Sequence, residues 1–523
     1  MTRLTELTSY ADAHRHYSKA ALWALFEGNR QRLNIAHECV DRHPPERCAV
    51  SIAYENGRYE HISFGELARW SNRAANVLED RGLVAGDRVA IMLEPGLAFY
   101  ALLFGAMKLG CVAVPLFTLF GPDGLALRLD DCTPAVIFTG SEHVQIAEQA
   151  CRSRANPPGI VAADRAFIEV LERAPDTFAA ATSADDMAMF QYTSGTTREL
   201  PEAVKHRHRS IVTVAVAALY ATGVRPGDRF MCPSSPSWGH GLWHGTLGPL
   251  GLGVSIASYS GRFRPERLLA ALAELEITNL SAAATHYRLM KNSGAAHRHR
   301  YMLDKLSFTG EPIDDETAMW ARTTFGRLPC SMYGSTEIGV ILADYPGAPD
   351  HCVRLGALGK PVPGQEVAVV GPNGEPCRPR QIGEIVVRRG DGWFRTKDLA
   401  LVDEQGYFFH RGRADDVIIS AGWTMSAVEI ENTLLAHPDV QEAAVIGVPD
   451  RDRGQVVKAF IVSGRSGDDA FLAELQKFTK DRLSQHEYPR QVAFVGELPK
   501  STTGKVSRAK LREQERMARG EHA

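Results

Sequence analysis

The hydrophobic positions of the chain alternate between helical and strand spacing over most of its length. Apolar residues recur at helical intervals over 64–78, and the segment 87–93 that follows, apolar from residue 89 on, predicts a buried strand. A second helical stretch, 98–108, precedes the short apolar run 111–115. Strand–helix–strand succession is typical of parallel sheets covered by helices, so this half of the chain predicts an α/β fold.

The pattern changes in the last third of the chain. Near 383–388 the segments become short strands separated by glycine-rich turns, which predicts a β-rich subdomain. After residue 413 a compact α+β pattern begins, with strands at 417–420, 442–448 and 457–462, helix 427–436, and a charged helix from 507 onward. We therefore predict a large N-terminal domain, 1–413, of parallel-sheet α/β subdomains plus the β-rich subdomain, and a small α+β C-terminal domain, 414–523.

Composition narrows the classes of protein. The 523 residues carry 59 Lys plus Arg against 62 Asp plus Glu, a formal net charge of −3, whereas nucleic-acid coats show a strong basic excess. No apolar run is long enough to predict stable insertion in a membrane. Nine scattered cysteines without a CxxC pair, and an N-terminus without a hydrophobic leader, favour a cytoplasmic protein.

One segment of the sequence could bind phosphate, and five further motifs accompany it. The hydroxyl-rich segment 191–197, Gln-Tyr-Thr-Ser-Gly-Thr-Thr, can present hydroxyl and backbone N–H groups to phosphate oxygens, although alone it is typical of a surface turn. Five further segments follow it along the chain: Phe-Thr-Gly-Glu-Pro at 308–312, Met-Tyr-Gly-Ser-Thr-Glu at 332–337, Phe-Arg-Thr-Lys-Asp at 394–398, Gly-Arg-Ala-Asp-Asp at 412–416 and Pro-Lys-Ser-Thr-Thr-Gly-Lys at 499–505.

With these motifs in this order, the chain resembles the adenylate-forming superfamily of acyl-CoA synthetases, carrier-protein adenylation domains and luciferases. Within it the chain is most similar to acetyl- and medium-chain acyl-CoA synthetases, over residues 33–511. The resemblance implies an enzyme that uses ATP, Mg²⁺ and coenzyme A to convert a small or medium carboxylic acid into its thioester. Its partners are then small molecules; the oligomeric state stays open, with a homodimer among the alternatives.

The resemblance also implies roles for the residues that bind the nucleotide. Asp398 is implied to bind both ribose hydroxyls, and Arg413 to contact ribose and phosphate. The positions implied to bind the β- and γ-phosphates are Thr193, Ser194, Gly195, Thr196 and Thr197, and those implied to line or stack on the adenine are Gly310, Glu311, Pro312 and Tyr333.

The residues implied to act in catalysis lie in later motifs. Thr336 matches a hydroxyl near the α-phosphate, Glu337 the carboxylate that helps to hold Mg²⁺, and Lys505 the mobile lysine that bridges the acyl carboxylate and the α-phosphate. Positive charge belongs there because a carboxylate that attacks a phosphate joins two anions. Asp415 matches the hinge of the C-terminal domain, and Gly422 lies on the segment that lines the pantetheine tunnel after rotation.

The chain departs from the family pattern at several positions. Arg198 stands where the phosphate loop usually has glycine, Glu202 where it usually has lysine, Lys397 in place of the glycine before Asp398, and Thr424 where a basic residue is frequent. The altered loop keeps a nucleotide-binding but inactive homologue among the alternatives. The second alternative is an enzyme that adenylates an acid and loads it onto a separate carrier protein.

The acid-binding pocket is the least determined part of the site. The candidates for the wall of this pocket are Trp238, His240 and Trp243. Bulky indoles in the wall would shorten the pocket and favour a short acid. The alternative interpretation is that one or both tryptophans only pack in the core. Aliphatic and aromatic acids both stay open. The pairs His206/His208 and His297/His299 stand among Arg and Lys, which favours solvated basic loops over metal sites.

Overall fold

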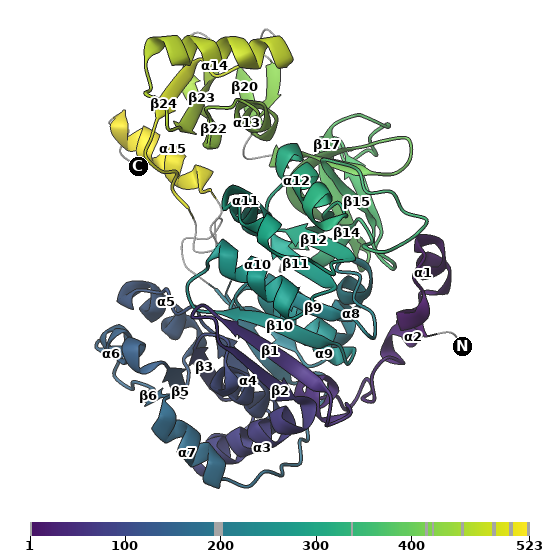
Figure 1. Cartoon of the computed structure of the whole chain (residues 1–523), viewed down its shortest axis with the longest axis vertical. Helices are drawn as coiled ribbons and strands as arrows, with labels where there is room; N and C mark the ends of the chain where they lie inside the picture. The colour runs from purple at the N-terminus through teal and green to yellow at the C-terminus, as the bar shows by residue number, and fades with distance from the viewer. Residues whose placement is uncertain are drawn as a thin grey trace. The chain divides into compact units, whose positions relative to one another are not determined.

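The computed structural model consists of two compact units (Figure 1). It describes residues 3–192, 202–335, 338–413, 417–420, 423–450, 454–483, 488–500 and 506–519. Unit 1 comprises residues 1–313, 317–353 and 362–364, and unit 2 comprises residues 314–316, 354–361 and 365–523. The predicted domain boundary after residue 413 falls within unit 2 and stays a prediction.

Unit 1 contains two sheets. The larger runs in the order β14-β13-β12-β11-β9-β10-β1-β2. Its strands from β13 to β1 are parallel to one another, whereas β14 is antiparallel to β13 and β2 to β1. Its strands are β1 (Cys48–Tyr54), β2 (Tyr59–Ser63), β9 (Arg229–Cys232), β10 (Ser255–Ser260), β11 (Asn279–Ala283), β12 (Lys305–Thr309), β13 (Cys330–Ser335) and β14 (Gly339–Ala343). The smaller has the order β6-β5-β3-β4-β7-β8: β3 (Arg88–Met92), β4 (Val112–Pro115), β5 (Val136–Thr139), β6 (Gly159–Ala162), β7 (Met187–Gln191) and β8 (Val204–Arg207).

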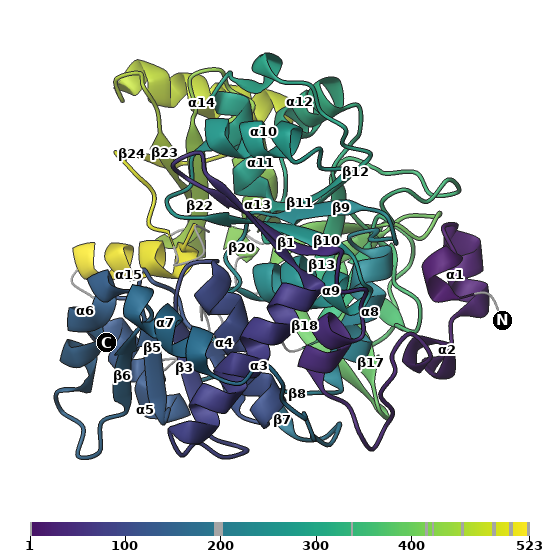
Figure 2. The same ribbon diagram turned by 60° about the horizontal axis from the view of Figure 1, so that its bottom comes forward.

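Helices cover both faces of both sheets. A layer of α3 (Phe64–Asp80), α4 (Leu97–Leu109), α8 (Ser210–Tyr220) and α9 (Gly248–Gly251) lies between the sheets and shares one apolar core with them (Figures 1 and 2). The outer face of the larger sheet packs on α10 (Pro265–Glu274), α11 (Ala284–Asn292) and α12 (Asp315–Phe325). The outer face of the smaller packs on α5 (Pro122–Cys132) and α6 (Val144–Cys151). Further helices of this unit are α1 (Tyr10–His16), α2 (Lys19–Trp23) and α7 (Arg165–Arg173).

The central helix pair illustrates how local sequence sets this layering. Ser63 and Glu66 form a capping box that starts α3, and Gly110 at φ 82° ends α4. Almost all of α4 is buried, because a helix between two sheets has no face left for solvent. At Gly105 a Cβ would lie 2.7 Å from Ala74 Cβ, so glycine is what lets α3 and α4 approach closely.

Unit 2 combines an antiparallel sheet with an α+β part. The sheet contains β16-β17-β18-β19-β15: β15 (Ala357–Pro361), β16 (Val367–Val370), β17 (Gly383–Arg389), β18 (Gly392–Val402) and β19 (Phe408–Arg413). The α+β part has the hairpin β20 (Val417–Ser420) and β21 (Trp423–Ser426), and the sheet β22 (Glu442–Asp450), β23 (Gly454–Val462) and β24 (Gln491–Phe494). Helices α13 (Ala427–Leu435) and α14 (Asp469–Arg482) pack on one face of that sheet, and α15 (Arg508–Ala518) on the other.

The predicted fold class is confirmed. The stretches predicted from periodicity at 64–78, 98–108, 427–436 and from 507 onward are helices α3, α4, α13 and α15. The segments predicted as strands at 87–93, 111–115, 383–388, 417–420, 442–448 and 457–462 are strands β3, β4, β17, β20, β22 and β23. Within the described residues, no helix combines the length and the apolar content needed to cross a bilayer.

Candidate functional site

Two of the predicted adenine-binding segments meet at one edge of the larger sheet. Gly310, Glu311 and Pro312 follow the last residue of β12, and Tyr333 lies on the parallel neighbour β13. Phe308 pairs with Ser331, so the register brings Gly310 level with Tyr333. Carboxyl ends of parallel strands are where open α/β sheets bind ligands. The structure thus brings together the two segments that the sequence separates by about twenty residues.

Side chains of α11 and the backbone of β14 fix this edge. Thr285 Oγ1 donates a 2.6 Å hydrogen bond to Glu311 Oε1, and Arg288 Nη1 lies 3.5 Å from the same oxygen. Gly334 follows Tyr333 on β13, and a Cβ there would lie 2.0 Å from Gly339 O on β14, so the close approach of these two strands requires glycine. Glu311 is therefore held by the helix next to its strand.

The segment predicted to bind phosphate, 193–197, lies outside the described residues, but its flanks share one anchor. Tyr192 Oη lies 2.8 Å from Asp131 Oδ2 and 2.8 Å from Arg128 O. On the far side of the loop, Ala203 N donates to the same Asp131 Oδ2 at 2.9 Å. Burial raises the pKa of Tyr192, which keeps its hydroxyl a donor. Asp131 was not predicted from the sequence, because an isolated carboxylate on α5 carries no signal of this contact.

Trp243 ties the strand before that loop to the predicted pocket segment. Its Nε1 donates to Gln191 Oε1 at 2.9 Å, and both side chains are buried. The ring centroids of Trp243 and His206 are 4.8 Å apart. Trp243 lies on η4 (His240–Leu247), a helix of π type, which is often found at functional sites. The indole N–H of Trp243 therefore has an internal partner and works as a structural tie.

His240 is held from both sides of its ring. Its Nδ1 lies 3.0 Å from Ser234 Oγ and its Nε2 2.8 Å from Ser281 Oγ, and the residue is 3% exposed. Trp238 is only partly buried and meets His240 edge-on, with ring centroids 5.3 Å apart. Of the three predicted wall residues, Trp238 is thus the one whose side chain is partly open to solvent.

The imidazoles around Trp243 are neutral and internal. Burial lowers the pKa of both His206 and His244 to about 4. Within the described part of the chain, His206 Nε2 and His244 Nδ1 have no hydrogen-bond partner. The interpretation of His206 and His208 as a solvated basic loop is wrong. His206 lies on β8 and His208 directly follows it, and alternation along the strand turns Lys205 and Arg207 outward instead. The ring of His208 is held inside, since its Nδ1 accepts from Ile35 N at 3.0 Å.

The predicted ribose-binding pair lies across two strands of unit 2. Asp398 on β18 pairs with Arg413 on β19, and Arg413 Nη1 lies 3.6 Å from Asp398 Oδ1. His410 Nε2 lies 3.6 Å from the same oxygen. The carboxylate is therefore flanked by two basic groups. His410 was missed in the sequence, because it stands three residues before Arg413 and regular alternation would turn it to the opposite face of β19. The pairing is irregular here, since Gly412 and His410 pair with the successive residues Leu399 and Ala400.

The other predicted residues lie outside the described part of the chain: Thr193, Ser194, Gly195, Thr196, Thr197, Thr336, Glu337, Asp415, Gly422 and Lys505. Next to Lys505 the described flanks pair with each other, since Lys500 and Val506 form a β-bridge and Ser507 N donates to Pro499 O at 2.7 Å. Their roles stay predictions.

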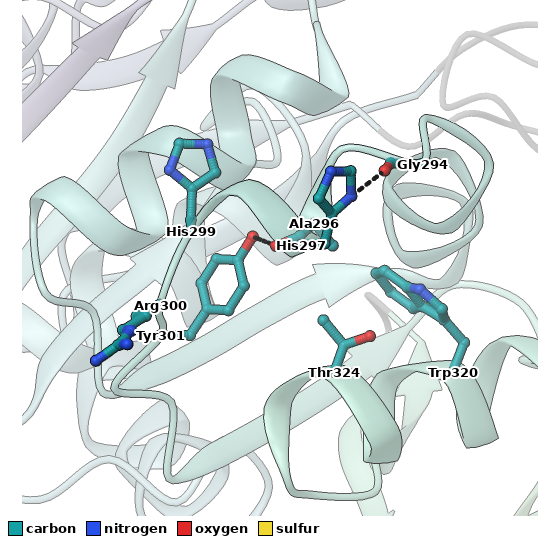
Figure 3. Close-up of a pocket in the computed structure, with 8 residues that line it drawn as sticks. All are labelled: Gly294, Ala296, His297, His299, Arg300, Tyr301, Trp320 and Thr324. Atoms are coloured by element: carbon teal, nitrogen blue, oxygen red, sulfur yellow. Dashed lines mark hydrogen bonds between the residues drawn. The ribbon is translucent and has the colours of Figure 1, made fainter.

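Two other features of the described residues do not coincide with the predicted site. His437, Asp439 and Glu474 bring their ligand atoms within 4.8 Å of one another, but Arg465 already pairs with both carboxylates. A cavity of about 710 Å³ lies beside the loop that enters β12, at the opposite end of that strand from Gly310, and is lined by Gly294, Ala296, His297, His299, Arg300, Tyr301, Trp320 and Thr324 (Figure 3).

The polar groups of that cavity do not converge on a ligand position. Tyr301 Oη donates to Ala296 O and His297 Nδ1 bonds to Gly294 O, both at 2.9 Å. Arg300 extends away from Trp320 in Figure 3. The predicted site therefore remains at the carboxyl ends of the strands.

Comparison with known proteins agrees with this fold and site. A family model described as AMP-binding enzyme matches residues 36–396, and one described as AMP-binding enzyme C-terminal domain matches residues 429–505. Acetyl-coenzyme A synthetase of Bacillus subtilis (strain 168) is 29% identical over 552 residues, covering 97% of this chain and 95% of that protein.

Solved structures give the same result. The crystal structure of acyl-CoA synthetase from Brucella canis superposes with a TM-score of 0.76 at 31% identity, covering 98% of this chain and 100% of that one. An anthranilate CoA ligase in complex with anthranoyl-AMP gives a TM-score of 0.85 at 25% identity, covering 94% and 98%.

The fold and these matches define an adenylate-forming CoA ligase, that is, an AMP-forming acid–thiol ligase that uses ATP and CoA. The chain belongs to the AMP-binding enzyme family, and within it to the acyl-CoA synthetases of the adenylate-forming superfamily.

Proposed function

We propose that this enzyme activates a small or medium carboxylic acid as its acyl-adenylate and transfers the acyl group to CoA. The observation that supports this most is the meeting of Gly310–Pro312 with Tyr333 at the carboxyl ends of neighbouring strands, in a chain of this family. ATP would lie with its adenine against these residues, and Asp398 with Arg413 would bind the ribose.

In the first half-reaction a carboxylate oxygen of the acid attacks the α-phosphorus and pyrophosphate leaves. Lys505 would neutralise the two anions as they meet, and Thr336 would donate to the α-phosphate. Mg²⁺ commonly binds through one or two carboxylates plus substrate phosphates, so Glu337 is a donor of the right kind for it. When bound, the ion would supply positive charge to the phosphates.

In the second half-reaction the CoA thiolate attacks the acyl carbon and AMP leaves. That step does not need Lys505 in the site, so a rotation about Asp415 would let the C-terminal domain exchange Lys505 for the segment around Gly422, beside the pantetheine. Lys505→Ala should therefore slow adenylation by about 10²–10³-fold while supplied acyl-adenylate is still converted to thioester. Equal loss of both half-reactions would refute the exchange.

The chain length of the acid would be set by the pocket segment that carries Trp238, His240 and Trp243. Since Trp243 is tied to Gln191 and His240 to two serines, Trp238 is the side chain best able to set the pocket length. Trp238→Ala should shift the preferred acid to a longer chain, while Trp243→Phe should lower stability without that shift. An unchanged preference in Trp238→Ala would show that Trp238 is core packing. The similar proteins include both an acetyl and an anthranilate enzyme, so aliphatic and aromatic acids both belong in the test.

Pyrophosphate release across a panel of acids, with and without CoA, tests the whole proposal. Thioester formation with CoA supports it. Adenylate that accumulates until a carrier protein is added would support a carrier-loading enzyme, and nucleotide binding without turnover of any acid would indicate an inactive homologue.

A further inference from the structure

The segment before Asp398 interrupts the regular pairing of β18. Val386 pairs with Arg395 and Glu384 with Leu399, so residues 396–398 bulge opposite the single residue between Val386 and Glu384 on β17. Lys397 within this bulge has φ 62°, the left-handed region that favours glycine. A lysine there is strained, and strained residues gather at functional sites.

The shape of the bulge does not depend on the lysine side chain. Lys397 N donates to Glu384 Oε1 at 2.9 Å, and Arg395 Nε donates to Glu384 Oε2 at 2.8 Å. Thr396 Oγ1 donates to Ile385 O at 2.9 Å and accepts from Asp398 N at 3.1 Å. These bonds fix the backbone and aim Asp398, and glycine would satisfy every one of them with less strain.

What the lysine adds is a charge beside the predicted ribose site. The residue is exposed, and no ion pair or hydrogen bond of its ammonium occurs among the described residues. The nearest carboxylates along the strand are already engaged, Glu384 by Arg395 and Asp398 by Arg413 and His410. The ammonium is thus available to an external anion.

We propose that Lys397 binds a phosphate group of a nucleotide co-substrate, either ATP or CoA. The inference rests on the proposed function, in which Asp398 holds a ribose, because phosphates are attached to ribose and Lys397 is the exposed cation directly before Asp398 in the chain. A lysine ammonium is a common phosphate ligand that acts as a point charge.

The test compares Lys397→Gly, Lys397→Gln and Lys397→Arg in the full chain. Kd and KM are measured for ATP, for CoA and for dephospho-CoA. Lys397→Gly and Lys397→Gln should raise both constants about ten-fold for one co-substrate, as expected for one charge-assisted contact, with kcat at saturation unchanged. Lys397→Arg should stay near wild type. Only Lys397→Gly relieves the left-handed strain, so it should melt at a higher temperature than Lys397→Gln.

The comparison of ATP, CoA and dephospho-CoA identifies which phosphate Lys397 binds. A rise confined to ATP assigns the contact to ATP; a rise for CoA that is absent with dephospho-CoA assigns it to the ribose phosphate of CoA; a rise for both forms of CoA assigns it to the pyrophosphate. Arg380 is the matched control, because it is also exposed, lies in unit 2 and has φ 65°, but pairs with Glu404. Arg380→Gly should relieve the same strain and leave every constant unchanged.

Unchanged constants in Lys397→Gly and Lys397→Gln, or equal changes in Arg380→Gly, would overturn the proposal. Because Kd is measured without turnover, this failure is distinct from failure of the proposed function, which would be a wild-type enzyme that binds nucleotide and forms no adenylate with any acid.

Discussion

Replacing Asp131 with alanine removes the common anchor of the predicted phosphate loop. Asp131 Oδ2 accepts from Tyr192 Oη at 2.8 Å and from Ala203 N at 2.9 Å, on either side of residues 193–201. Hydrogen bonds to a charged acceptor contribute about 1.5–3 kcal/mol each, and exposure of Asp131 screens them, so we take about 2 kcal/mol for the pair. If that free energy orders the loop for ATP, KM for ATP rises about 10- to 30-fold.

The assay is steady-state pyrophosphate release with ATP, acid and CoA varied in turn. Asp131→Asn retains an acceptor oxygen without the charge, so its KM for ATP should lie between those of wild type and Asp131→Ala. Asp130 is the matched control: it is the neighbouring acid on α5, and its exposed carboxylate pairs only with Arg154 among the described residues. Asp130→Ala should leave KM for ATP within about two-fold of wild type.

Two results would refute this reasoning. One is the same KM for ATP in Asp131→Ala and Asp130→Ala, which would mean that the loop does not depend on its anchor. The other is an equal rise of KM for ATP, acid and CoA in Asp131→Ala, which would indicate general loss of folded enzyme.

Two predictions concern the interior of unit 1. Trp243→Phe leaves the buried Gln191 without its donor, so it should lower the free energy of unfolding by about 2–4 kcal/mol. In a double-mutant cycle, Gln191→Leu should destabilise Trp243→Phe by about 1 kcal/mol less than it destabilises the wild type. Strictly additive urea midpoints would contradict the contact between the two side chains. Burial lowers the pKa of His206, His208 and His244 to about 4, below the ordinary 6.5, so the unfolded chain binds more protons between pH 4 and 6.5. The free energy of unfolding should therefore fall as pH drops through this window, by up to about 1.4 kcal/mol per pH unit for each imidazole, and a variant that lacks one of them should show a smaller slope.

Periodicity predicted the secondary structure well where one pattern dominated. Helices α3 and α4 and strands β3 and β4 appear where apolar spacing placed them, because burial between layers imposes that spacing. Composition misled at His206 and His208: the surrounding Lys and Arg suggested a solvated loop, but alternation along β8 decides which side chains are buried.

Contacts between distant segments could not be predicted. The anchor at Asp131 joins residues about 60 to 70 positions apart, and Trp243 reaches Gln191 across 52. Nothing local in the sequence distinguishes these side chains from others of their type. The motifs predicted Gly310–Pro312, Tyr333, Asp398 and Arg413, and the structure brings the first two segments together in unit 1 and the last two residues together in unit 2.

The topology of the larger sheet also constrains how the chain folds during synthesis. β1 pairs with β2 directly after it, but its other edge pairs with β10, with Val50 opposite Ile256, 206 residues later. At about 5–20 residues per second the ribosome needs roughly 10 to 40 s to deliver that partner. Throughout this interval the free backbone groups on one edge of the nascent β1–β2 hairpin are open to wrong strand pairing, so chaperone binding during translation should protect this part of the enzyme.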